Sequence, residues 1–426
     1  MDRRKRKRGC GVLCLLLAAA AGAVLFGCRD SIAALLRAQQ EKIMETAALE
    51  DASTEDGGQE QAGAGEGSAV SGEPSGTEKY YFQQLDERER EVYGKIRDGL
   101  LAFQEEIELE DASTEEIDRL YGLVMKDYPE IFWCDGAGSV VTSSASFGLS
   151  GRSAALRPEY NCSEEEKEER RSRIEAEADQ CLSGIDSQAG DYDKILYVYE
   201  YVIGGVEYDL SAPDNQNIYS VFVGRRSVCA GYAKAVQYLL ERLGVFCTYV
   251  SGTAVSRSGE GGHAWNLVRC EGQYCYVDAT WGDPVYLQEG REEDQEAQES
   301  PEIAYDYLCC DDTQLFRTHT PDSDQELPAC STMAYNYYVV NGMYYETYDP
   351  ETILQAMNRS IAAGEGMTVL KFSGPEVYRE AREEVLTDLA DRAARNLAHL
   401  YGIGTVRYSY RDDDSLDKIT MYWDYE

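Results

Sequence analysis

Residues 227–244 read SVCAGYAKAVQYLLERLG, an apolar pattern that begins with a cysteine. Apolar side chains recur at helical spacing and predict one buried helix stripe, formed by Cys229, Ala233, Val236, Leu240 and Leu243. Gly244 follows, as is typical of a helix end. Cys229 would then lie in the first turn, where free backbone N–H groups and the helix dipole stabilise an anion. Its thiol is therefore either a small buried apolar group or a reactive nucleophile.

The next segment, 263–284, reads HAWNLVRCEGQYCYVDATWGDP and alternates around Glu271-Gly272, as a two-residue hairpin turn does. With that turn, Cys270 faces Gln273, and His263 and Asp278 become diagonal neighbours on one face. Their Cα atoms would be roughly 7–8 Å apart, close enough for a histidine–carboxylate hydrogen bond. A three-residue turn would instead place the two side chains on opposite faces.

A cysteine at a helix start, a histidine on a strand and an aspartate that orients it form the arrangement of thiol acyl transfer. The histidine takes the thiol proton, and the aspartate fixes the tautomer of the imidazole. Backbone N–H groups at the helix start, including that of Cys229, could hold the oxyanion. Ala230 and Gly231 are small, and we expect them to leave the helix mouth open to a substrate.

The motifs VCAGYAKAVQYLLERLGV, GGHAWNLV and YVDATWGDP, in this order over about 217–285, closely resemble the transglutaminase-like superfamily of bacteria and archaea. The resemblance implies an α+β fold with a papain-like core, in which the cysteine helix packs on an antiparallel sheet. It also implies that Cys229 is the nucleophile, His263 the general base and Asp278 the orienting acid. We expect no cofactor and no metal. Gly282 departs from the acidic residue more frequent at its position. Two flanking segments, YPEIFWCDG and YDYLCCDD with the later RTH, resemble those of extracytoplasmic members in Gram-positive bacteria.

The chain has 426 residues and a net charge of -38, which argues against nucleic acid or anionic lipid as the main partner. Residues 1–8 are basic, and the uncharged run 9–28 is long enough to cross a bilayer as a helix of about 30 Å. The basic flank would stay in the cytoplasm and place the rest of the chain outside. The helical rhythm continues through 29–49, as expected of an uncleaved anchor, whereas the residues up to Cys28 also resemble a lipoprotein cleavage site. Both alternatives predict membrane tethering.

The rest of the chain divides by composition. Residues 50–79 are acidic and rich in Gly and Ser, which predicts a disordered linker. We expect an N-terminal α+β region over 80–190, the transglutaminase-like domain over 191–330 and a C-terminal α+β region over 331–426. Helices are predicted in the ranges 84–107, 114–127, 163–182 and 375–399, and residues 192–209 are predicted to form a helix that leads to an extended stretch. In the tail, Asn341-Gly342 predicts a hairpin, followed by strands at 367–372, 405–410 and 418–423.

Other side chains are weaker candidates. Gln216 or Tyr219 could complete an oxyanion hole, and Trp265 and Trp281 either contact substrate or fill the core. His319 lies in a polar stretch and is either structural or a zinc ligand with Cys309, Cys310 or Cys330, although the cysteine spacing does not support zinc. Cys330 could alternatively form a disulfide with Cys309 or Cys310. His399 at a helix end suits the dipole, and the acidic run 292–299 is expected to be a solvated loop.

These features predict a membrane-tethered, extracytoplasmic cysteine enzyme that acts on amide bonds through an acyl-enzyme. It would be a peptidase, an amidase or a transglutaminase, and cell-wall peptides or surface proteins are the expected substrates. The alternative is a non-catalytic surface module for binding or scaffolding on the same fold.

Overall fold

The computed structural model describes residues 79–110, 112–144, 152–256, 259–283, 302–402 and 407–425. All of them belong to the second of two compact units, Glu73–Glu426. The predicted anchor 9–28, the segment 29–49, the linker up to residue 78 and the acidic run 292–299 lie outside the described residues. No helix within the described ranges is long and apolar enough to span a membrane.

The N-terminal elements are helices beside a small sheet. The helices are α2 (Tyr80–Gln83), α3 (Glu87–Leu101), α4 (Thr114–Asp127) and α5 (Glu164–Leu182), and the sheet has the order β1 (Ile107–Glu110), β3 (Arg152–Tyr160), β2 (Cys134–Ser144). Three helices begin with capping boxes, in which Asp86, Ser113 and Ser163 each accept from the backbone N–H three residues later. The helix predicted over 84–107 was too long: α3 ends at Leu101, and Ile107 already belongs to a strand.

A five-stranded antiparallel sheet carries the hairpin predicted from the sequence. Its order is β10 (His319–Pro321), β6 (Cys247–Ser256), β7 (Gly259–Cys270), β8 (Gln273–Val277), β9 (Leu308–Cys310). Cys270 pairs with Gln273, which confirms the predicted register. Glu271 and Gly272 both have positive φ, 47° and 83°, as a tight two-residue turn of this type requires. The glycine-rich stretch 259–262 belongs to β7.

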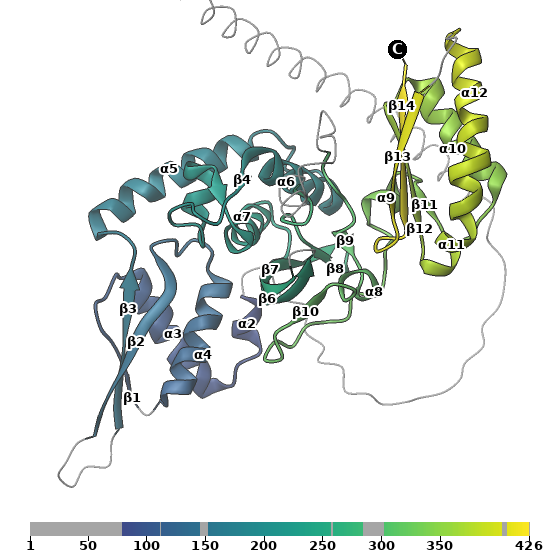
Figure 1. The fold of residues 1–426 in the computed structure, drawn as a ribbon. Coiled ribbons are helices and arrows are strands. Elements are labelled where there is room, and N and C mark those ends of the chain that lie inside the picture. Colours follow the sequence, from purple (N-terminus) through teal and green to yellow (C-terminus); the bar gives the residue numbers. More distant parts are fainter. Residues whose placement is uncertain are drawn as a thin grey trace, which may run out of the picture. The chain divides into compact units, whose positions relative to one another are not determined.

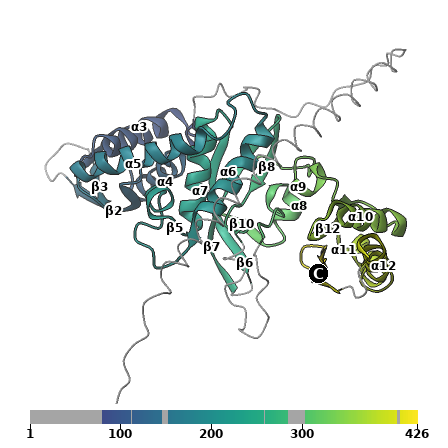
Figure 2. The same cartoon turned by 90° about the horizontal axis from the view of Figure 1, so that it is seen from above.

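Two helices lie along one face of this sheet, α6 (Asp191–Gly205) and α7 (Cys229–Arg242) (Figures 1 and 2). Asn266 of β7 donates to the Ala233 carbonyl at 2.9 Å and ties α7 to the sheet. The helix is buried on most sides rather than along one stripe, because Tyr232, Lys234 and Gln237 are buried as well. The predicted α+β fold with the cysteine helix on an antiparallel sheet is confirmed.

One hydrophobic core runs through the N-terminal elements, α6, α7 and the helix-facing side of the sheet. The opposite face of the sheet has a second core, which includes Val250, Trp265, Tyr276 and Tyr307. Short elements connect these parts: β4 (Glu207–Tyr208), β5 (Arg226–Ser227), a π-helical turn at Ser220–Gly224 and α8 (Asp312–Leu315). The sheet is therefore covered on both faces, which buries the side chains on each face of β7.

The C-terminal part has its own core and a four-stranded sheet. The strand order is β11 (Tyr344–Tyr345), β12 (Met367–Phe372), β14 (Lys418–Asp424), β13 (Arg407–Asp413), and the helices are α9 (Tyr337–Val340), α10 (Pro350–Ala363), α11 (Pro375–Glu384) and α12 (Ala390–Tyr401). A π-helical turn, Val385–Leu389, joins α11 to α12. His399 lies in the last turn of α12, which confirms its predicted position at a helix end, and its side chain is exposed.

The hairpin predicted around Asn341-Gly342 is wrong. Asn336 accepts from Tyr338 N and caps the short helix α9, and its buried amide also donates to the Leu308 carbonyl at 2.8 Å. Gly342, with φ 66°, then ends this helix, and β11 pairs in parallel with β12. A buried side-chain cap, which local sequence does not reveal, decides between helix and hairpin here.

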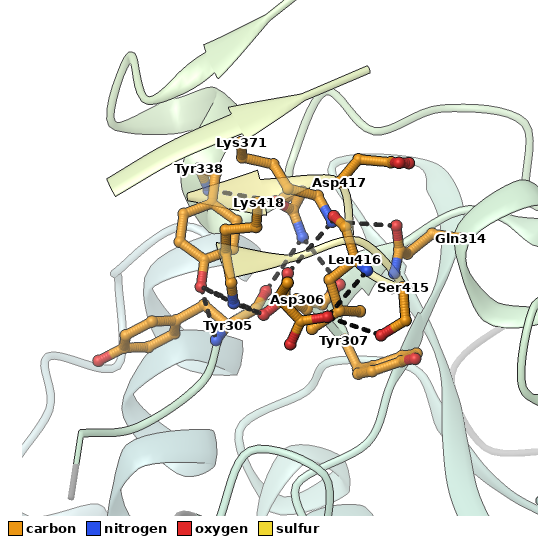
Figure 3. A network of polar contacts seen from close by, with 12 residues as sticks. Tyr305, Asp306, Tyr307, Gln314, Tyr338, Lys371, Ser415, Leu416, Asp417 and Lys418 are labelled. Carbon is orange, nitrogen blue, oxygen red and sulfur yellow. Dashed lines mark hydrogen bonds and ion pairs between the residues drawn. The ribbon is translucent and has the colours of Figure 1, made fainter. Parts of the chain in front are cut away.

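A buried ionic network links the C-terminal sheet to the segment before β9 (Figure 3). Asp306 is 1% exposed and accepts from Lys371 Nζ of β12 at 3.1 Å and from Lys418 Nζ of β14. Lys371 Nζ also donates to Gln314 Oε1 at 3.2 Å and to the Leu416 carbonyl at 2.6 Å. Lys371 and Lys418 of the C-terminal sheet therefore bind Asp306, which lies just before β9 of the five-stranded sheet. Lys371 also binds Gln314 of α8, which follows β9.

Gly252 of β6 is expected to tolerate no side chain. A Cβ at this position would lie 2.1 Å from the Thr320 carbonyl oxygen of β10 and 2.8 Å from the Trp265 ring. We expect Gly252→Ala to lower the free energy of unfolding by about 1–3 kcal/mol, because the neighbouring backbone must move. Gly261→Ala in β7 is the matched control, since a Cβ there meets no atom within 4 Å. Equal urea midpoints for both variants would contradict this prediction.

Candidate active site

Cys229 begins α7, and the residue before it, Val228, has an extended backbone and makes no side-chain cap. The first helical hydrogen bond joins Tyr232 N to the Val228 carbonyl at 3.0 Å. The N–H groups of the first turn therefore precede the helical ladder and are available to an anion. Cys229 is half-buried, as is Cys162, whereas the other described cysteines are buried.

Gly231 has a packing role rather than the expected role of opening the helix mouth. A Cβ on Gly231 would lie 1.9 Å from Ser227 Oγ and 3.1 Å from the Asn215 carbonyl oxygen. Ser227 Oγ in turn donates to that carbonyl at 3.0 Å. The close approach of the segment that contains Asn215 to the first turn of α7 thus requires glycine.

His263 lies between the thiol and Asp278. His263 Nε2 and Asp278 Oδ2 are 2.7 Å apart, the hydrogen bond that the hairpin register predicted. Because an ionised carboxylate carries no proton, Nε2–H is the donor, which leaves Nδ1 for the thiol. Burial lowers the pKa of His263, but the charge of Asp278, the hydrogen bond to it and a hydrogen bond with Cys229 raise it to about 10. The three predicted residues are thus brought together in one line of contacts.

Asp278 is held from four directions. Its Oδ1 accepts from Trp281 N at 3.1 Å, and its own N–H donates to the Tyr307 carbonyl at 3.0 Å. Its Oδ2 accepts from His263 and, at 3.0 Å, from His319 Nε2. Burial raises the pKa of Asp278, but the two histidines outweigh burial and hold the pKa well below its usual range. Asp278 is 1% exposed and is nevertheless stabilised as an anion.

His319 is not the polar-loop residue that the sequence suggested. It is buried in β10, pairs with Ala254 of β6 and donates to Asp278. The sequence analysis considered His319 as a zinc ligand together with Cys309, Cys310 or Cys330. The structure instead places His319 beside His263 and Asp278. Their ligand atoms lie within 4.8 Å of one another and could hold a metal ion, although here they bind one another. The stretch LFRTHTPD gives no local signal for this contact, which depends on β10 joining the sheet.

All ten cysteines within the described ranges are free thiols. The disulfide considered between Cys330 and Cys309 or Cys310 is therefore not formed. Each of these three thiols is buried, and burial raises the pKa of Cys310 and of Cys330. Buried neutral thiols of this kind behave as small apolar side chains.

The two tryptophans of the motif surround the imidazoles. Trp265 is fully buried, and its ring packs against His263 at 6.0 Å and His319 at 5.0 Å between centroids. The proposed substrate contact of Trp265 is therefore corrected to a core role. Trp281 is 9% exposed, with its ring 4.7 Å from that of His319, and a substrate contact for it stays a prediction.

Both candidates for the second oxyanion donor have hydrogen-bond partners outside the triad. Gln216 is exposed, and its amide donates to Asn215 Oδ1 at 3.0 Å. The Tyr219 hydroxyl accepts from Arg173 of α5 at 2.9 Å, and its ring stacks near Phe132. In this arrangement Tyr219 is directed toward α5, so an oxyanion role for either residue stays a prediction.

Packing explains why glycine stands at position 282, where the resemblance led us to expect an acidic residue. A Cβ there would lie 2.1 Å from the Tyr199 hydroxyl and 2.6 Å from Ile203 Cδ1, both on α6. The next residue, Asp283, is 2% exposed and accepts from the Tyr232 hydroxyl of α7 at 2.7 Å. Asp283 and Tyr232, which sequence reasoning did not assign to the site, thus tie the loop after Asp278 to the cysteine helix.

The raised pKa of His263 gives a direct test of this geometry. Since the folded pKa is about 10 and an unpaired histidine titrates near ~6.5, protonation of His263 should stabilise the fold fully below pH 6.5. That stabilisation should decline as the pH rises and vanish above about 10. We expect NMR titration to show this late midpoint for His263. A His263 midpoint near 6.5 would contradict the described hydrogen bonds.

Comparison with known proteins places this site in a family context. Residues 179–279 match the family model described as the Transglutaminase-like superfamily. Kyphoscoliosis peptidase from Homo sapiens is 29% identical over 118 residues, and the Mus musculus protein of the same name is 30% identical over 105 residues. These matches cover 24% and 22% of this chain, and it spans only 18% and 16% of those two proteins.

A solved structure described as a TGase is 15% identical, with a TM-score of 0.25, and covers 39% of this chain and 48% of its own. The segment matched by the family model contains Cys229, His263 and Asp278 and confirms the resemblance of the three sequence motifs. Residues 179–279 are therefore similar to the transglutaminase-like superfamily.

Proposed function

We propose that this protein is a thiol enzyme that transfers acyl groups from amide bonds through Cys229. One observation carries the proposal: the half-buried thiol at the start of α7 contacts His263, which Asp278 holds by a 2.7 Å hydrogen bond. This is the nucleophile, base and orienting acid arrangement of acyl-transfer enzymes.

In the proposed reaction, the proton that His263 Nδ1 carries as an imidazolium is the one given up by the Cys229 thiol, and the resulting Cys229 Sγ thiolate attacks the carbonyl carbon of the amide. The N–H groups of the first turn of α7 stabilise the oxyanion that forms. His263 then gives its proton to the leaving amine as the C–N bond breaks, which leaves a thioester on Cys229. Water attacks the thioester to release an acid, or an amine attacks to form a new amide, and His263 takes the proton of the attacking group.

The substrate class and the location extend the same proposal. The word peptidase in the names of the two relatives favours a peptide or protein substrate. The predicted anchor over residues 9–28, or lipidation at Cys28, would tether the domain outside the cell and bring cell-wall peptides and surface proteins within its reach. Both hydrolysis and amine transfer are compatible with this chemistry.

Iodoacetamide labelling followed by peptide mass spectrometry tests the catalytic proposal. We expect Cys229 to react much faster than Cys162 at neutral pH, because both thiols are half-buried but only Cys229 has a histidine partner. Equal rates would favour a non-catalytic binding or scaffold module. Incubation with a library of cell-wall and other peptides, then mass measurement of the intact protein, should reveal the acyl group carried by Cys229.

A further inference from the structure

Asp278 accepts a hydrogen bond from a second histidine that the acyl-transfer scheme does not use. His319 Nε2 lies 3.0 Å from Asp278 Oδ2, the same oxygen that accepts from His263 Nε2 at 2.7 Å. The side chain of His319 is completely buried. Since Oδ2 of the carboxylate carries no proton, both imidazoles donate to it. A buried carboxylate with two such donors is stabilised as an anion and has little freedom to rotate.

The other ring nitrogen of His319 is also fixed. Nδ1 lies 2.8 Å from Thr318 Oγ1, and Thr318 Oγ1 lies 2.9 Å from the Tyr307 hydroxyl. All these groups are satisfied when the Tyr307 hydroxyl donates to Thr318 and the Thr318 hydroxyl donates to Nδ1. The Tyr307 carbonyl meanwhile accepts from Asp278 N at 3.0 Å. Tyr307 thus anchors the backbone of Asp278 and, through Thr318, orients the histidine that holds its side chain.

The surroundings leave the His319 ring little room to turn. Trp265, Trp281 and Tyr307 pack around it with centroid distances of 5.0, 4.7 and 5.2 Å. On β6, the strand between His319 and His263, small residues lie opposite both histidines: Ala254 faces His319 and Gly252 faces His263. The absence of large side chains there is compatible with the 5.3 Å separation of the two imidazole rings.

We propose that His319 is a positioning residue of this site, which holds Asp278 ionised and turned toward His263 and acts on Cys229 only through Asp278. This role rests on the acyl-transfer function proposed above. His319, on the edge strand β10, would then be a fourth residue of the site. Through Asp278, it would orient His263 toward the thiol of Cys229.

Few other titratable groups face Asp278. They are Tyr199 of α6, Tyr307 before β9 and Cys310 of β9, and burial raises the pKa of each. All three are neutral over the pH range of a rate profile. A change in the acid limb of that profile on removal of the His319 donor therefore arises in the line of Asp278, His263 and Cys229 and not in these three neighbours.

The test compares His319→Gln with His319→Leu, two side chains of similar size. The glutamine amide can still donate to Asp278, whereas leucine cannot. We expect alkylation of Cys229 by iodoacetamide at neutral pH to be about tenfold or more slower in His319→Leu than in His319→Gln. The acid limb of the rate should move to higher pH in the leucine variant alone, because loss of a donor raises the pKa of Asp278. Circular dichroism establishes that both variants are folded.

Equal alkylation rates and equal acid limbs for the two folded variants would overturn the role of His319. A wild-type Cys229 that reacts no faster than Cys162 would instead overturn the proposed function itself, so the two failures are distinguishable. If the His319 variants do not fold, Thr318→Val removes only the hydroxyl that orients Nδ1. It should slow alkylation of Cys229 several-fold, and an unchanged rate would count against the proposal.

Discussion

Replacing His263 by alanine is expected to abolish most of the reactivity of Cys229. The variant loses the group that removes the thiol proton and the cation that stabilises the thiolate. An ordinary thiol is only ~1% ionised two pH units below its pKa of about 8.5. Alkylation of Cys229 at pH 6.5 should therefore slow by about 10²-fold. Acyl transfer, which also needs proton donation to the leaving amine, should fall by ~10⁴-fold.

The rate constant for iodoacetamide, followed on the Cys229 peptide by mass spectrometry, measures the first effect. The rate of thioester formation, on a substrate identified by acyl-enzyme trapping, measures the second effect, which is the loss of acyl transfer. His399→Ala is the matched control because that imidazole is exposed on α12, far along the chain from the site. A His263→Ala protein that labels as fast as His399→Ala would show that His263 does not activate the thiol.

Replacing Asp306 by alanine should cause the largest loss of stability outside the site. The variant leaves Lys371 and Lys418 in a buried environment without their shared carboxylate. Removing one partner of a buried ionic network typically costs about 3–5 kcal/mol, because the remaining charge is uncompensated. Urea denaturation followed by fluorescence should show this decrease, with Asp414→Asn, at an exposed position, as the control.

The two lysines should differ in their contribution. Burial lowers the pKa of Lys371, and the neighbouring Lys418 lowers it further, whereas the pKa of Lys418 is raised, chiefly by the charge of Asp306 against the effect of burial. Lys418 is therefore the main counter-charge of Asp306. We expect Lys371→Met to cost less than Lys418→Met, since it removes hydrogen bonds to Gln314 and Leu416 but keeps the charged pair. A Lys371→Met variant as unstable as Asp306→Ala would contradict this division.

The sequence by itself determined the hairpin that places His263 beside Asp278, because a two-residue turn sets strand parity for every residue of β7 and β8. It also predicted that a helix begins at Cys229, where an apolar 3.6-residue pattern starts. The expectation that this thiol meets His263 rested on the residue types of acyl transfer and on the resemblance of the three motifs, not on local rules. The same local rules predicted α4, α5 and β12 with nearly correct bounds. They failed at Asn341-Gly342, where the long-range bond from Asn336 to Leu308 stabilises a helix.

Only the tertiary structure decided what surrounds this line of residues. His319 reaches Asp278 because β10 pairs with β6, a contact between residues more than 60 positions apart that no periodic pattern announces. Gly231 and Gly282 are required by the close approach of Ser227 and Tyr199, and Asp306 finds its lysines more than 60 and 110 positions later. These partners come from separate elements, and which elements meet is fixed by burial of whole faces rather than by the local sequence.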